Sequence, residues 1–233
     1  MPEQIVRIAD LYKSYYRDSI EIPVLRNINF EIQEGEFLAL MGPSGSGKTT
    51  LLNMIAGIDQ PTSGTMSVAG EDISRLSDSE LARWRSRHIG FIFQFYNLLP
   101  VLMAYENVEL PLLLTKLSKG ERREHVETAL NIVGLGDRMK HYPRQLSGGQ
   151  EQRVAIARAI VTDPTLILAD EPTAPLDSER ALNVIRMLNQ MAEQYQTAII
   201  VVTHDEKIIP TFKRIYHIRD GRTYEEAGEG KHV

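Results

Sequence analysis

A glycine-rich segment at residues 42–49, with the sequence GPSGSGKT, constrains this chain more than any other feature. It fits the pattern G-x-x-x-x-G-K-[ST] and lies between an apolar run at 37–41 and a segment at 49–56 with apolar residues at helical spacing. In a strand–loop–helix unit, consecutive backbone N–H groups surround a phosphate at the positive end of the helix. The alternative is a glycine-rich turn that contains an incidental lysine. The candidate phosphate-binding residues are Gly42, Ser44, Gly45, Ser46, Gly47, Lys48, Thr49 and Thr50.

A second candidate feature is a pair of acids at the end of an apolar run. Residues 166–169 read LILA, and Asp170 and Glu171 follow directly. In a parallel sheet the carboxyl end of this strand faces the same crevice as the glycine loop. Asp170 can then join Thr49 in the shell of a Mg²⁺ ion, while Glu171 points at the water that attacks a terminal phosphate. The alternative is a strand end that turns into solvent.

Composition narrows the class of protein. The chain has 233 residues, 42% apolar and 24% charged, which is typical of one large folded domain. A net charge of −5 gives no basic field for nucleic acid, so we expect no nucleic acid partner. The absence of cysteine excludes disulfides and a catalytic thiol. The longest apolar stretches fall far short of the roughly 20 residues that span a bilayer, and no secretory signal is present, so we expect a cytoplasmic chain.

The order of the apolar patterns predicts an α/β fold with a mostly parallel sheet. Strands are expected at 5–9, 24–32, 37–41, 90–94, 166–169 and 198–203, and helices at 49–56, 77–88 and between the last two strands. Residues 106–163 are mostly helical in pattern and indicate an inserted helical subdomain, placed at roughly 95–163. We expect one domain over 1–224 and a flexible tail at 225–233, because that tail is too polar to pack.

A third motif is the sequence LSGGQ at residues 146–150, followed by Arg153, which resembles the signature of ATP-binding-cassette (ABC) ATPases. Ser147 can cap a helix that begins at Gly148, which leaves N–H groups in the first turn free for a second anion. In the family, two subunits pair head to tail, and each signature closes the partner's nucleotide site. The resemblance therefore implies a homodimer in which Ser147, Gly148, Gly149 and Gln150 bind nucleotide.

The resemblance covers residues from about 5 to 222. It implies an ABC-type P-loop ATPase core, in which an N-terminal antiparallel β part and a helical subdomain join the mostly parallel sheet. ATP and Mg²⁺ are then the expected ligands, and hydrolysis of ATP to ADP and phosphate is the expected reaction. Membrane permease subunits are the expected partners, so the chain is expected on the cytoplasmic face of the cell membrane.

Four more residues match functional positions of the family. Tyr15, 27 positions before Gly42, matches the aromatic residue that stacks on adenine. Gln94 matches the Q-loop glutamine, which senses Mg²⁺ and water, and Asp177 matches the D-loop aspartate that acts across the dimer. His204 matches the switch histidine at the γ-phosphate, so the expected catalytic set is Glu171, His204 and Gln94. The alternatives are an exposed tyrosine, a glutamine after a strand and a structural histidine.

Two departures from the family pattern are visible. Ala174 and Pro175 stand where relatives commonly have Gly-Asn or Ser-Ala, and the proline removes one backbone donor beside the D-loop. Glu151 replaces a common glutamine in the first turn of the signature helix. Its negative charge favours the helix dipole but weakens the field offered to a γ-phosphate.

A finer resemblance lies in residues 91–100, FIFQFYNLLP, and 106–112, ENVELPL, which look like the ATPases of the MacB and LolD group. That group drives lipoprotein release or efflux through the cell envelope. We expect a separate permease, contacted near Phe95–Leu99, although local core packing is an equal alternative for these residues. The competing functions are control of cell-wall hydrolases and a soluble role in translation or DNA repair.

Overall fold

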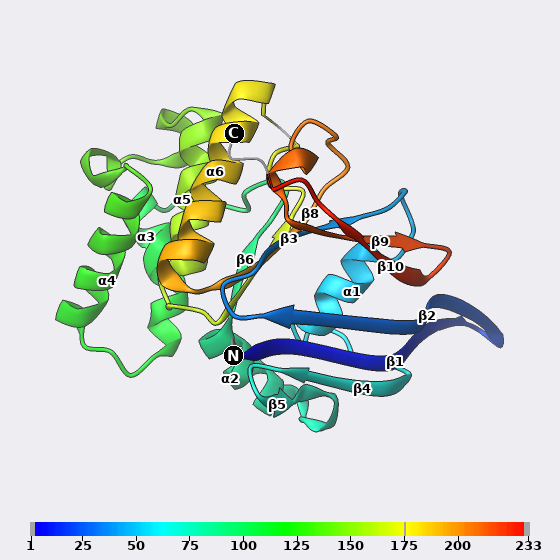
Figure 1. Ribbon diagram of the computed structural model, residues 1–233. Coiled ribbons are helices and arrows are strands. Elements are labelled where there is room, and N and C mark those ends of the chain that lie inside the picture. The colour runs from blue at the N-terminus through cyan, green and yellow to red at the C-terminus, as the bar shows by residue number, and fades with distance from the viewer. Residues whose placement is uncertain (1–2, 175, 231–233) are drawn as a thin grey trace.

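The computed structural model describes residues 3–174 and 176–230 and places them in two sheets and a group of helices (Figure 1). The strands are β1 (Gln4–Arg17), β2 (Ile20–Gln33), β3 (Phe37–Met41), β4 (Ser63–Val68), β5 (Glu71–Asp72), β6 (Ile89–Ile92), β7 (Leu166–Asp170), β8 (Ala198–Val202), β9 (Arg214–Arg219) and β10 (Arg222–Ala227). The helices are α1 (Lys48–Ile55), α2 (Asp78–His88), α3 (Ala104–Glu109), α4 (Lys119–Ile132), α5 (Gly148–Ile160) and α6 (Ser178–Tyr195). Five short 3₁₀ turns are η1 (Ile73–Arg75), η2 (Leu110–Leu114), η3 (Gly136–Arg138), η4 (Pro143–Gln145) and η5 (Ile209–Thr211).

One sheet is mostly parallel and the other is antiparallel, which confirms the expected fold class. The six-stranded sheet has the order β10-β9-β3-β8-β7-β6, and only the β9–β10 pair in it is antiparallel. The four-stranded sheet has the order β2-β1-β4-β5. Strands β3, β8 and β7 are neighbours and run in one direction. The glycine loop, the acid pair and His204, which follow these three strands, therefore leave the sheet at the same edge.

The parallel strands are apolar on both faces because each face is covered. Leu38 and Leu40 of β3 pack into the core shared with α1 and the antiparallel sheet, whereas Phe37 and Ala39 pack into the core shared with α3 to α6. This alternation follows from the two-residue period of a strand. Among the described residues, no helix is long and apolar enough to cross a membrane.

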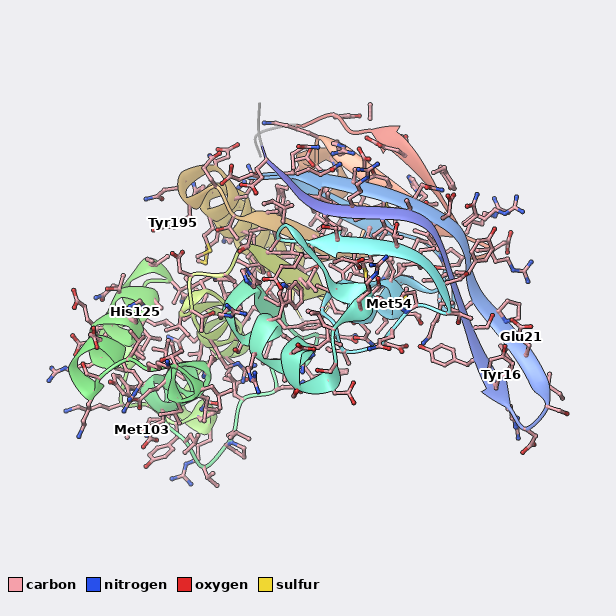
Figure 2. All side chains as sticks on the ribbon, turned by 90° about the horizontal axis from the view of Figure 1, so that it is seen from below. Tyr16, Glu21, Met54, Met103, His125 and Tyr195 are labelled. Atoms are coloured by element: carbon pink, nitrogen blue, oxygen red, sulfur yellow. The ribbon has the colours of Figure 1, made fainter. Side chains whose placement is uncertain are left out.

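The inserted helices lie far from the antiparallel sheet. The helices α3, α4 and α5 come between β6 and β7 in the chain and form the green part of Figure 1. Figure 2 shows Met103 and His125 in this part, and Tyr16 and Glu21 at the opposite end of the molecule, where the β1–β2 hairpin projects.

The tail expected to be flexible contains ordered structure, so that prediction is wrong for residues 225–227. Glu225, Glu226 and Ala227 belong to β10, which pairs with β9. The polar composition was misleading because the charges are paired. Arg214 Nε lies 2.8 Å from Glu225 Oε1, and His217 Nε2 lies 2.9 Å from Glu226 Oε2.

The N-terminal strands extend well beyond the expected ranges. β1 has 14 residues and β2 has 14 residues, against expected strands at 5–9 and 24–32. Their pairing contains register shifts, for example between Ile8 and Leu11. Such bulges break the strict alternation of apolar and polar residues by which strands are predicted.

Candidate functional site

The glycine loop joins β3 to α1 and has the backbone shape that its glycines predict. Gly47 caps α1 in the left-handed region, at φ 102°. Gly42, at φ 152°, lies so close to the carbonyl oxygen of Ile218 that a Cβ there would stand 2.3 Å from it. At Gly45, by contrast, a Cβ would meet no atom within 4 Å, so the loop leaves open space at this point. An anion can approach the backbone there without a side chain in the way.

The side chain of Lys48 binds the first residues of its own loop. Its ammonium donates hydrogen bonds to the carbonyl oxygens of Gly42, at 2.7 Å, and Pro43, at 2.9 Å. The hydroxyl oxygen of Ser46 is buried and has no hydrogen-bond partner among the described residues. A buried polar atom without a partner is costly, and Ser46 is not among the residues that line the cavity at this loop.

The acid pair lies beside this loop. Burial raises the pKa of Asp170, the charge of Glu171 raises it further, and Lys48 and the hydroxyl of Thr49 oppose the rise. Glu171 adopts a left-handed backbone conformation, at φ 47°, and its N–H donates to the carbonyl oxygen of Val202 at 3.0 Å. Nδ1 of His204 lies 2.9 Å from Oε1 of Glu171. The register of β7 and β8 produces this contact, since Asp170 pairs with Val202.

These residues line one cavity of about 550 Å³. Its walls include most of the glycine loop together with Asp170, Glu171 and His204, so the structure brings together residues that are far apart in the sequence. Its lining is Val24, Gly42, Pro43, Ser44, Gly45, Gly47, Lys48, Thr49, Thr50, Asp170, Glu171, Val202 and His204. The hydroxyl and carboxylate oxygens of this cavity are suitable ligands for Mg²⁺. Its backbone N–H groups are suitable hydrogen-bond donors to the oxygens of a phosphate.

Tyr15 is held at the edge of this region by charged residues. Its hydroxyl donates to Asp59 Oδ2 at 2.6 Å, and the ammonium of Lys13 lies 4.7 Å from the ring centroid. Lys13 also pairs with Asp59 Oδ1 at 2.6 Å. Burial raises the pKa of Tyr15, and the hydrogen bond to Asp59 raises it further, while a contact with Thr50 lowers it. Tyr15 as a whole is 41% exposed, so part of its side chain is accessible to an aromatic ligand.

The signature motif caps α5 as expected. Ser147 Oγ accepts from the N–H of Gln150 at 3.4 Å, and the side chain of Gln150 accepts from the N–H of Ser147 at 2.8 Å. This capping box engages the amide oxygen of Gln150. The N–H groups of Gly148 and Gly149 lie in the first turn, where the helix supplies no acceptor.

The signature does not reach the glycine loop within one chain. Ser147 and Gly149 line another cavity, of about 360 Å³, together with Arg153 and Arg180. The described linings of the two cavities share no residue. Asp177 lies near the second cavity, where its side chain caps α6 by accepting from the N–H of Arg180 at 3.0 Å.

Gln94 and the two residues that depart from the family pattern, Glu151 and Pro175, differ in what the structure says of them. β6 ends at Ile92, so Gln94 lies in the turn that follows rather than in the strand, and it is not among the residues that line the 550 Å³ cavity. β6 is the edge strand, farther from β3 than β7 and β8 are. Burial raises the pKa of Glu151. Pro175 lies outside the described residues.

Sequence reasoning missed three charged residues that support the site. Lys13 and Asp59 fix Tyr15, and Arg158 of α5 binds the segment after Gln94. Each is a single charged residue in a strand, loop or helix, and no sequence motif distinguishes it from a charged residue that faces solvent. Only the folded arrangement shows their partners.

A glycine loop between a parallel strand and a helix, with two acids at the end of a neighbouring strand, defines the class of P-loop nucleotide-binding ATPases. The comparisons with known proteins agree. The family profile described as ABC transporter matches residues 25–174. This chain therefore belongs to the ABC transporter family, and it is an ATP-binding, ATP-hydrolysing subunit of the MacB-like group.

Three similar proteins illustrate this membership. The ABC transporter ATP-binding protein YknY of Bacillus subtilis is 48% identical over 93% of this chain and 94% of its own length. The macrolide export ATP-binding/permease protein MacB of Marinobacter nauticus is 44% identical over 97% of this chain, which spans 35% of that protein. A dimeric post-hydrolysis state of the ATP-binding cassette MJ0796, bound to ADP and Pi, is 42% identical with a TM-score of 0.86, over 96% of this chain and 98% of that one.

Proposed function

We propose that this chain uses Mg²⁺ to hydrolyse ATP as a head-to-tail homodimer and drives a separate membrane permease. The proposed work is lipoprotein release or efflux across the cell envelope. The observation that carries the proposal is the cavity in which Lys48, Thr49, Asp170, Glu171 and His204 converge. These side chains supply a phosphate clamp, metal ligands, a base and a γ-phosphate contact.

Each residue has a proposed role that fits its surroundings. Lys48 exchanges its bonds to loop carbonyls for phosphate oxygens. Thr49 and Asp170 of the cavity, with Gln94 from the turn after β6, would hold Mg²⁺, which would supply positive charge at the reacting phosphoryl group when bound. The raised pKa of Asp170 fits such a site, because a cation relieves the cost of its buried charge.

Glu171 is the proposed catalytic base. Its carboxylate lies at the end of β7 beside the glycine loop, where it can orient a water toward the terminal phosphate. His204 follows β8 and contacts Glu171, which supports a role for it at the γ-phosphate. Both roles require the side chains to stay within hydrogen-bond reach of the same cavity.

The homodimer follows from the separation of the two anion sites. One chain has its glycine loop in one cavity and its signature in another, so a two-fold axis can complete both nucleotide sites at once. The dimeric solved relative supports this arrangement. In the proposed dimer, Tyr15 stacks on adenine, and Ser147, Gly148, Gly149, Gln150 and Asp177 act on the partner's nucleotide.

The proposed permease contact lies just after Gln94. Phe95 is 75% exposed and Leu99 is 45% exposed, and Val101 beyond them is 77% exposed. Exposed apolar side chains this close together in the chain fit a protein interface. Relatives such as MacB, whose name joins the ATP-binding and permease functions, support a membrane partner. YknY is named as an ATP-binding protein alone, which supports a permease on a separate chain.

The experiment is a pull-down of tagged Glu171→Gln protein, loaded with ATP, from native membranes. We expect a permease with few membrane spans and a large external domain to co-purify. A Phe95→Ser variant of the same protein is the matched control, which should keep ATP and lose the permease. Recovery of a permease with many membrane spans, or of no membrane protein, would contradict the proposal.

A further inference from the structure

The segment that follows Gln94 has an unusual backbone. Tyr96 and Asn97 both lie in the left-handed region, at φ 57° and φ 50°. Neither is glycine, and the conformation is unfavourable for a side chain as large as tyrosine. Two such residues in succession persist only where neighbouring groups fix them.

Their N–H groups bond to the carbonyls of Phe93 and Phe95 within the turn, and Arg158 binds their own carbonyls from another element. From the last turn of α5, its Nη2 donates to the carbonyl oxygen of Tyr96 at 2.6 Å, and its Nη1 donates to that of Asn97 at 2.7 Å. Successive carbonyls point to opposite sides in an extended chain and to the same side in a helical conformation. The left-handed shape therefore aligns the two carbonyls so that one planar guanidinium can bind both.

The same segment contacts the other end of the signature helix. The hydroxyl of Tyr96 lies 3.6 Å from the position of a Cβ on Gly148, the first residue of α5. Burial raises the pKa of Tyr96, the charge of Glu151 in the first turn raises it further, and the charge of Arg180 lowers it. The segment is thus held to α5 by the hydrogen bonds at its two carbonyls, and the Tyr96 hydroxyl lies beside the first residue of the same helix.

The C-terminal end of the same segment, at Leu99, is held by a second side chain. Asn107 of α3 is fully buried, and its side chain accepts from the N–H of Leu99 at 2.8 Å and donates to the carbonyl oxygen of Leu99 at 3.1 Å. Both anchors belong to helices that pack against each other. The residues between them cannot shift without moving α5 or breaking a hydrogen bond.

We propose that Arg158 is a positioning residue that joins the backbone after Gln94 to the signature helix, so that the two move as one unit. A displacement at Phe95–Leu99 then changes the orientation of Ser147 and its free N–H groups. The permease end of this path rests on the proposed function, but the joint itself lies entirely within this chain. The guanidinium of Arg158 binds the segment after Gln94, and Arg158 is not among the residues that line the cavity of the glycine loop and the acid pair, so its effect should fall on turnover rather than on ATP binding.

The test uses Arg158→Met, which keeps the aliphatic stem, and Arg158→Lys, which keeps the charge without the planar fork. We expect both to lower kcat about tenfold while KM for ATP changes by less than about twofold. Hydrogen exchange of the amides in 93–99 should quicken about tenfold, whereas the sheet keeps its protection. The matched control is Arg85→Lys, because Arg85 of α2 also donates to a backbone carbonyl, that of Gly57 after α1 at 2.7 Å, and not to this segment. It should change neither readout.

Two results would overturn the inference. One is a kcat within about twofold of the parent in both Arg158 variants, with unchanged exchange in 93–99. The other is a uniform loss of protection together with weaker ATP binding, which would make Arg158 a general structural support. Neither readout involves the permease, so the membrane pull-down tests the proposed function separately.

Discussion

The support of Tyr15 by Lys13 and Asp59 gives a prediction with a calculable size. Asp59→Asn removes the carboxylate that the Lys13 ammonium contacts at 2.6 Å, with exposed side-chain fractions of 10% for Lys13 and 26% for Asp59. Breaking a buried pair by removing one partner costs about 3–5 kcal/mol. Lys13 keeps a second bond, to the carbonyl oxygen of Gln60 at 2.7 Å, and water reaches Asp59. We therefore expect a loss of about 2–3 kcal/mol in the free energy of unfolding.

The assay is urea unfolding at neutral pH, with Lys13→Met and the double variant as controls. Removing both charges leaves no unpaired ammonium, so the double variant should be more stable than the sum of the two single losses predicts. ATP affinity should also fall in Asp59→Asn, since the ring of Tyr15 loses its anchor. A loss below about 0.5 kcal/mol, the range of an exposed pair, would refute the reasoning.

The pH dependence of the same group has a definite sign. Burial alone would raise the pKa of Asp59, but hydrogen bonds from Lys13, Tyr15 and Gln60, with the charge of Lys13, lower it below its ordinary 3.8. A group whose pKa is lower in the folded state stabilises the fold at pH values above its pKa in the unfolded state. This stability is lost as the pH falls through the folded-state pKa. The stability difference between the parent and Asp59→Asn should therefore shrink below about pH 4.

Two further predictions concern other charged groups. Asp170→Asn should abolish hydrolysis yet raise the thermal midpoint of the nucleotide-free chain at pH 7 by roughly 2–4 °C, seen by calorimetry. Because the folded pKa of Asp170 is raised, the free energy of unfolding falls as the pH rises through that pKa. Asparagine carries no charge and removes this loss. A thermal midpoint of Asp170→Asn that is unchanged or lower than that of the parent would contradict the account. Arg214→Met should cost about 2–4 kcal/mol in urea unfolding, because Arg214 lies 2.6 Å from Glu36 and 2.8 Å from Glu225. Lys213→Met is its control, since the Lys213 pair is 3.9 Å long and exposed; equal effects of the two would refute the role of Arg214 in holding β10.

The glycine loop and its surroundings could be predicted because the information is local. The loop from Gly42 to Thr49 requires glycines at set positions, and the strand and helix beside it follow from short apolar patterns. The order of strands and helices also predicted the mostly parallel sheet correctly. Since parallel neighbours end at one edge, the meeting of Asp170 with Lys48 could be expected as well.

The errors come from contacts between distant parts of the chain. Glu225 looked like part of a solvated tail because its partner, Arg214, lies on another strand. Lys13 and Asp59 are 46 positions apart, and Arg158 lies 61 positions from Asn97, so no local pattern links them. The left-handed backbone conformation of Tyr96 could not be predicted either, because glycine is the residue that usually indicates this conformation in a sequence.

The central claim is that the glycine-loop cavity of one chain is completed by the signature of a second copy. Mixing two inactive variants tests it most directly: Lys48→Ala, which disables the loop, and Ser147→Arg, which blocks the signature. In a mixed dimer one of the two sites has an intact Lys48 and an intact Ser147, and random pairing makes half of the dimers mixed, so ATP hydrolysis should reappear on mixing at up to about a quarter of the parent rate. A mixture no more active than the two variants measured alone would contradict the head-to-tail account.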